Sequence, residues 1–167
     1  SQSGKGGVAS LLNTEYGLDL PRRMQIEFSG VIQKITDTTG KEINAAQIRQ
    51  VFDDTYLKPG ALELVGYSDL PGPAAGIRTL EVKLKHKTVT AQGSGPLAAV
   101  ANALSAEIGQ PIEISAYHEH ALSSVSDARA AAYIEAVVGG VTRWGAAIDG
   151  DITTASFKAL VSAVNRR

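Results

Sequence analysis

The chain has 167 residues, of which 44% are hydrophobic, so a packed core is expected and wholesale disorder is excluded. The net charge is −1 and no basic block occurs, which argues against nucleic acid as the main partner. The absence of cysteine excludes disulfides and thiolate metal sites. The sequence also lacks an apolar run of the roughly 20 residues that span a membrane, a signal-peptide layout and an initiator Met. We therefore expect a cytoplasmic protein without a membrane partner, and one that is part of a longer chain.

Residues 1–58 predict a helical linker subdomain. The opening SQSGKGGVA has three glycines in seven residues and does not fit the P-loop pattern, so we interpret it as a flexible connector. Pro21 suits a first helical turn, and Gly40 ends that helix. A second helix begins after Asn44, which forms a capping box with Gln47. Two short amphipathic helices bury their apolar stripes poorly alone, so this piece should dock on another part of the chain.

After residue 59 the pattern changes to strands. Alternating apolar residues predict strands at 62–65 and 80–85, and a third strand runs from Val89 to a glycine-rich turn. Pro96 then opens a helix that Gly109 closes. Three strands and a helix thus make one βββα unit.

The same order follows a second time. We predict strands at 112–116, 129–138 and 141–148, with a Gly139-Gly140 hairpin turn between the last two and a closing helix after Asp151. The helical segment ASFKALVSAVN also echoes PLAAVANALSA of the first unit. An internal duplication is therefore predicted, with repeats at about 60–109 and 110–167. The fold class is α+β: two βββα units related by internal pseudo-symmetry.

The stretch YHEHALSSVSDARAAAYIE, from Tyr117 to Glu135, is predicted to be strand, polar loop and strand. Alanine is a poor strand former, so the alanines at 128 and 130–132 indicate a surface that another backbone, a partner chain or a small ligand approaches closely. An alanine-rich helix from Asp127 to Val138 is the alternative.

The histidines do not indicate catalysis. His118 and His120 share a strand face, but Glu119 points to the other face and His86 is the only other histidine. We expect packed or hydrogen-bonded histidines and no metal. No G-x-S-x-G elbow supports a nucleophilic serine.

The turn Gly93-Ser94-Gly95-Pro96 leads into a helix whose free N–H groups suit a carboxylate or phosphate. Alternatively, the strand-to-helix junction needs the glycines for itself. Combined with Asp127 for an ammonium group and the alanines for an aliphatic side chain, the turn predicts a pocket for an amino acid.

The segments SQSGKGGVA, LPRRMQIEFSGVIQKITD, GSGPLAAVANAL, YHEHAL, DARAAAYIEA and ITTASFKALVSAVNR occur in this order over nearly the whole chain. Together they resemble the C-terminal part of the 2-isopropylmalate synthase family. The resemblance implies a linker subdomain at 1–58 and, at 59–167, an allosteric regulatory domain that binds L-leucine for feedback inhibition of leucine biosynthesis.

The resemblance also implies the partners. The parent enzyme is an acyltransferase that condenses acetyl-CoA with 3-methyl-2-oxobutanoate on a metal-dependent barrel preceding this segment. We therefore expect a homodimer attached to that barrel, with the divalent metal and the catalytic residues in the barrel and no cofactor or activity in this segment alone. The implied leucine-binding residues are Gly93, Ser94, Gly95, Ala98, Tyr117, Ala121, Asp127, Ala128, Ala130 and Ile148.

Two other interpretations stay open. The same fold serves as the regulatory domain of citramalate synthases, where the ligand would be isoleucine or leucine. A dimerisation module with a vestigial pocket would bind no amino acid.

Overall fold

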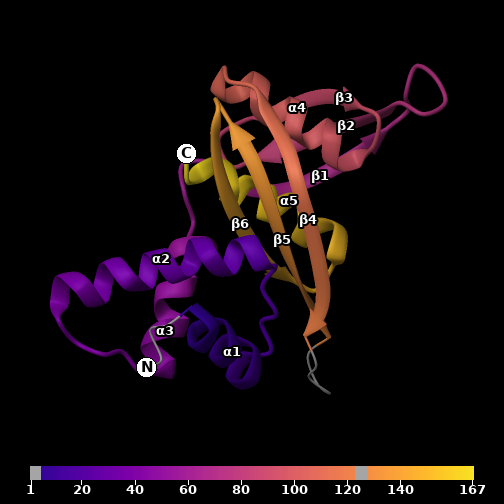
Figure 1. Ribbon diagram of the computed structural model, residues 1–167. Helices are drawn as coiled ribbons and strands as arrows, with labels where there is room; N and C mark the ends of the chain where they lie inside the picture. Colours follow the sequence, from indigo (N-terminus) through magenta and orange to yellow (C-terminus); the bar gives the residue numbers. More distant parts are fainter. Residues whose placement is uncertain (1–4, 123–127) are drawn as a thin grey trace.

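The computed structural model describes residues 5–122 and 128–167, which form helices and two three-stranded antiparallel sheets (Figure 1). A helical subdomain comes first. It consists of α1 (Lys5–Tyr16), α2 (Arg22–Thr39), α3 (Ala45–Phe52) and a π-helical turn, η1 (Asp53–Leu57). In Figure 1 it lies at the lower left.

Two βββα units follow, as predicted. The first unit contains β1 (Leu64–Leu70), β2 (Arg78–Leu84), β3 (Thr88–Gly93) and α4 (Pro96–Ile108). The second contains β4 (Ile112–Leu122), β5 (Arg129–Val138), β6 (Val141–Asp149) and α5 (Ile152–Asn165). In each sheet the strands are ordered as in the chain, so β5 is central and β4 and β6 are edges of the second sheet. The α+β prediction is confirmed.

Local sequence signals set several boundaries. The Asn44 carboxamide accepts from the Gln47 N–H at 2.9 Å, and the Gln47 side chain accepts from the Asn44 N–H at 2.8 Å, which completes the predicted capping box. Gly40 ends α2 with a φ of 68°, in the left-handed region that glycine adopts without strain. Gly139 and Gly140 both have positive φ, as a tight hairpin turn between β5 and β6 requires.

Two interpretations of the sequence are corrected. The connector proposed at the N-terminus is helical from Lys5 onward, because burial of Val8 and Leu12 in the helical subdomain outweighs the low helix propensity of its glycines. The alternative of an alanine-rich helix up to Val138 is wrong, because residues 129–138 form the central strand β5, buried on both faces.

One face of the second sheet packs against α5. A side chain at Gly145 would place its Cβ 2.2 Å from the Ala159 carbonyl oxygen and from the Ala163 nitrogen, so α5 lies directly on the β6 backbone. Phe157 of α5 also meets Tyr67 of β1 edge to face, with ring centroids 4.8 Å apart. Helix α5 therefore joins the two units in one core.

The other face of the second sheet packs against the helical subdomain. Ala131, Tyr133, Trp144 and Ala146 belong to the same buried cluster as the apolar stripes of α1, α2 and α3. The docking expected from those stripes occurs here. The alanines of β5 lie on both faces, since Ala131 faces the subdomain and Ala132 faces α5. Their small side chains let helices approach the sheet from both sides.

Candidate functional site

The predicted glycine-rich turn connects β3 to α4. A Cβ on Gly93 would lie 2.5 Å from the Ala99 nitrogen, so the protein backbone itself requires this glycine. Gly95 caps α4 in an extended conformation, and no neighbouring heavy atom lies within 4 Å of the position its Cβ would take. Ser94 is exposed and Ala98 is half-buried on the first turn. The end of α4 beyond Gly93 is thus open to a ligand.

The second half of β4 forms an uncovered surface beside α5. Tyr117, Glu119 and Ala121, which we call the β4 shelf, are all exposed, and Tyr117 retains 41% of its accessible surface. Their partners on β5 show which face they occupy, because residues directly opposite each other share a face. Tyr117 pairs with Ile134, which is fully buried in the same apolar cluster as Phe157 and Leu160 of α5. The β4 shelf therefore lies on the face of the second sheet that packs against α5, at the exposed end of that face.

The Tyr117 hydroxyl donates a hydrogen bond to the Glu119 carboxylate across the shelf. Partial burial and this carboxylate raise the pKa of Tyr117 to about 12, although Ser156 near the start of α5 opposes the increase. Tyr117 therefore stays neutral at physiological pH and places an aromatic ring beside the open surface.

The structure brings some predicted leucine-binding residues together and separates others. Ala121 pairs with Ala130, so both share the α5 face with Tyr117. Ala128 is exposed just before β5, whereas Asp127 lies outside the described residues. Ile148 pairs with Ala131 and packs against the helical subdomain, on the opposite face from Tyr117. Counting the register from the Gly139-Gly140 hairpin would have put Ile148 on the opposite face from Ala130.

Asp149 is a residue that the sequence analysis did not place on this face. It pairs with Ala130, and its carboxylate accepts from the Lys158 ammonium at 3.0 Å and from the Asp151 N–H at 3.0 Å. Burial alone would raise the pKa of Asp149, but these hydrogen bonds lower it below the ordinary value. The end of β6 therefore carries a negative charge that is tied to α5.

Two of the three histidines, His120 and His86, make hydrogen bonds, as expected, whereas His118 is exposed. The His120 ring nitrogen lies 2.8 Å from the Tyr133 hydroxyl and 3.2 Å from the Asp19 N–H, so it links the helical subdomain to the second sheet. His86 lies 2.9 Å from Glu107. Within residues 5–122 and 128–167, no cluster of three or more His, Asp or Glu side chains is suited to a metal ion.

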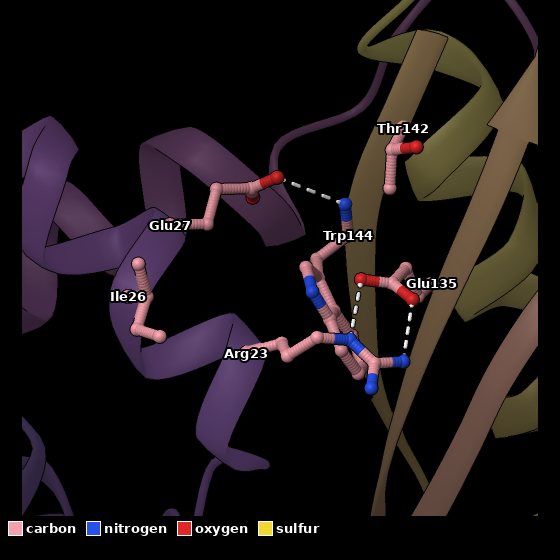
Figure 2. A pocket seen from close by; sticks show the side chains of 6 residues that line it. All are labelled: Arg23, Ile26, Glu27, Glu135, Thr142 and Trp144. Atoms are coloured by element: carbon pink, nitrogen blue, oxygen red, sulfur yellow. Dashed lines mark hydrogen bonds and ion pairs between the residues drawn. The ribbon is translucent and has the colours of Figure 1, made fainter. Parts of the chain in front are cut away.

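A polar junction fastens the helical subdomain to the second sheet. Figure 2 shows the small pocket there, of about 290 Å³, which we call the junction pocket. Arg23 reaches from α2 to Glu135 of β5 with two hydrogen bonds, of 2.7 and 3.1 Å. The hydrogen bond from Arg23 lowers the pKa of Glu135 against the opposing effect of burial. The pocket is lined by Arg23, Ile26, Glu27, Glu135, Thr142 and Trp144.

Glu27 is the centre of this junction. Its carboxylate accepts from the Tyr56 hydroxyl at 2.8 Å, the Trp144 backbone N–H at 3.1 Å and the Arg166 guanidinium at 2.5 Å. Arg166 also donates to the Trp144 carbonyl and lies over the Tyr56 ring, 4.6 Å from its centroid. Burial and the nearby Glu27 raise the pKa of Tyr56 well above its ordinary value, so its hydroxyl remains a donor. One side chain of α2 thus holds η1, β6 and the end of α5.

Known sequences identify the family. A family model described as the LeuA allosteric (dimerisation) domain matches residues 42–167. The chain belongs to this family. It is 50% identical over 176 residues to the 2-isopropylmalate synthase of Parafrankia sp. (strain EAN1pec), in an alignment covering 99% of this chain and 31% of that protein. It is 52% identical over 176 residues to the 2-isopropylmalate synthase of Kineococcus radiotolerans, with 99% of this chain and 30% of that protein covered.

The chain spans about 30% of the length of these curated relatives. The matched residues 42–167 include α3 and η1 as well as both βββα units, whereas α1 and α2 precede them. The boundary near residue 58 remains a prediction. In the described part of the chain, no helix is both long and apolar enough to cross a membrane.

Proposed function

We propose that this LeuA allosteric domain binds L-leucine and, within a longer 2-isopropylmalate synthase, mediates feedback inhibition of leucine biosynthesis. The β4 shelf is the observation that carries the proposal. Tyr117, Ala121 and Ala130 share one face there, and the small alanine side chains leave room for an aliphatic ligand. The open N-terminus of α4 supplies free N–H groups of the kind that bind a carboxylate.

The β4 shelf is also a suitable place for a second copy of the chain to pack. Strand β4 is an edge of the second sheet, and an exposed edge is a ready site for a second chain. We propose that a second copy covers the β4 shelf and that leucine lies near this interface. The proposal includes attachment to a catalytic barrel that holds a divalent metal and condenses acetyl-CoA with 3-methyl-2-oxobutanoate, in the cytoplasm. Residues 1–167 alone should release no CoA from acetyl-CoA in the presence of the keto acid.

Thermal unfolding with added amino acids tests the ligand. A ligand that binds only the folded chain, at about 100 times its dissociation constant, stabilises it by roughly 2.7 kcal/mol. L-leucine should therefore raise Tm, and isoleucine and valine should raise it less, because one methylene is worth about 1–3 kcal/mol in a fitted apolar pocket. A larger shift with isoleucine would instead favour a citramalate synthase regulatory domain. No shift with any of the three would favour a dimerisation module with a vestigial pocket.

A further inference from the structure

A second concave surface lies away from the β4 shelf, between the helical subdomain and α5. This groove, of about 500 Å³, is bounded by α3 and the segment joining η1 to β1 on one side and by α5 and the end of β6 on the other. The three shelf residues are not among the described residues that line it. Its size is within the range of small-molecule sites.

The lining side chains make this groove cationic. Among the described residues, Arg49, Lys58, Arg129 and Lys158 line it together with Glu63, and two of these cations are also paired with carboxylates beside the groove, Arg49 with Asp53 and Lys158 with Asp149. We call it the cationic groove. The four basic residues come from α3, the segment after η1, β5 and α5, so the fold and not one basic run in the sequence brings them together. A surface of this kind concentrates anions.

Two of the cations are held in fixed positions. The Arg49 Nε donates to Asp53 at 2.7 Å, and its guanidinium lies over the Tyr16 ring, 5.2 Å from the centroid. The Lys158 ammonium donates to Asp149 at 3.0 Å. Both groups keep further N–H donors, because a guanidinium has five and an ammonium three. A charged group fixed before binding loses less conformational entropy when a ligand arrives.

The outer edge of β6 adds a backbone donor. The Trp144 N–H and the Ala146 N–H leave the sheet at this edge, toward Glu27 and toward the Ser162 hydroxyl. Backbone groups on a strand alternate in direction, so the Ile148 N–H leaves at the same edge. Ile148 is among the residues that line the groove, so this N–H is the backbone donor that we assign to it.

Part of the wall is apolar. Three apolar residues line the groove: Leu62 from the segment before β1, Val161 from α5 and Ala147 from β6. All three are at least nine-tenths buried by the protein and belong to the core that holds α5. The groove therefore combines fixed cations with a small aliphatic wall.

We propose that the cationic groove binds a small organic anion with a short branched aliphatic body. Its carboxylate groups would bind Arg49, Lys58, Lys158 and the Ile148 N–H, and its methyl groups would contact Leu62 and Val161. Since Arg49 belongs to the helical subdomain and Lys158 to α5, the bound anion would bridge the two. This site is separate from the β4 shelf and does not depend on leucine binding there.

Titration of residues 1–167 with 2-methylsuccinate tests the site, by calorimetry at constant ionic strength and by amide NMR. We expect saturable binding, with the Ile148 amide resonance among those that move. Lys58→Gln and Lys158→Gln should each weaken binding at least about fivefold. Glu63→Gln should tighten it, because it removes a carboxylate that lines the groove. Lys41→Gln, at an exposed lysine outside the groove, should leave it unchanged.

Several outcomes would overturn the proposal. They are the absence of saturable binding, a stationary Ile148 resonance, or equal weakening by Lys41→Gln and Lys158→Gln, which would indicate general charge attraction. Inorganic phosphate, which lacks an aliphatic body, should bind more weakly than 2-methylsuccinate, and equal affinity would refute the role of the apolar wall. Displacement of 2-methylsuccinate by leucine would show one shared site and would refute a groove that is separate from the leucine site. None of these results would remove a leucine-induced rise in Tm, so the two proposals fail independently.

Discussion

Substitution of Glu27 by glutamine should weaken the contact between the helical subdomain and the second sheet and so lower the free energy of unfolding. Glu27→Gln keeps the shape of the side chain but removes the charge that holds Arg166. The carbonyl oxygen of the introduced glutamine can still accept from the Trp144 N–H, and the Tyr56 hydroxyl can rotate to accept from the new amide. The loss of the Arg166 interaction should therefore dominate.

The size of the effect follows from burial. Removing one partner of a fully buried ion pair costs about 3–5 kcal/mol. Here the side chains of Arg166 and Glu27 keep 19% and 22% of their exposure, so water partly compensates the remaining guanidinium. We therefore expect a loss of about 2–3 kcal/mol in the free energy of unfolding. For a chain of this length, that corresponds to a decrease in Tm of roughly 5–10 °C.

Urea unfolding followed by fluorescence and by circular dichroism measures this loss. Trp144 is the only tryptophan of the chain and is 2% exposed at the junction, so its emission reports on this contact. Glu15→Gln, at an exposed position of α1, is the matched control and should change stability by less than about 0.5 kcal/mol. A Glu27→Gln midpoint equal to that of the control would refute the assigned role of Glu27.

Three further results are expected. Gly145→Ala should cost about 3 kcal/mol in thermal unfolding, because its Cβ would enter the α5 backbone, whereas Gly66→Ala, with no atom closer than 3.9 Å, should cost far less. Gly30→Ala, exposed within α2 and unobstructed, should raise stability by about 0.5–1 kcal/mol in the same assay. Because Arg23 lowers the pKa of Glu135, the ionised Glu135 carboxylate stabilises the folded chain above about pH 4.5. This stabilisation is lost as the pH falls through the folded-state pKa of Glu135. Glu135→Gln should therefore flatten the decline of the urea midpoint in that acidic range, and an unchanged decline would contradict the assignment.

The elements that sequence patterns predicted are those whose determinants are local. The Asn44 capping box, the Gly40 terminus and the Gly139-Gly140 hairpin each depend on residues within one turn. The strict alternation over 80–85 likewise matches the buried residues of β2. These signals sufficed for the order of helices and strands and for the repeat of the βββα unit.

Features set by distant contacts were missed. Helix α1 depends on tertiary burial of Val8 and Leu12, which its glycines obscure. The first strand begins at Leu64 and not at Leu62, because the Leu62 N–H and carbonyl bond the Asn165 carboxamide instead of a strand. Asn165 lies 103 residues from Leu62 in the sequence, so only the assembled fold shows this contact.

The candidate site was predictable in part. The alanines at 128 and 130–132 indicated a close approach, and the structure places Ala130 on one face with Tyr117 and with Ala121, which the family resemblance had implied. The assignment of Ile148 to the same pocket came from the family resemblance without the strand register, which puts it on the opposite face. The cationic groove could not be predicted, since its basic residues lie on four separate segments.

Calorimetric titration of L-leucine tests the central proposal most directly, with two variants of the same helix compared. Ala98 lies on the open first turn of α4, whereas Ala106 is exposed near its other end, so Ala98→Val and Ala106→Val carry the same helix-propensity cost. We predict saturable leucine binding by the parent chain, unchanged in Ala106→Val and at least about tenfold weaker in Ala98→Val, a difference of about 1.4 kcal/mol. Absence of leucine binding by the folded parent chain, or equal affinity in both variants, would contradict a leucine site at the β4 shelf and the start of α4.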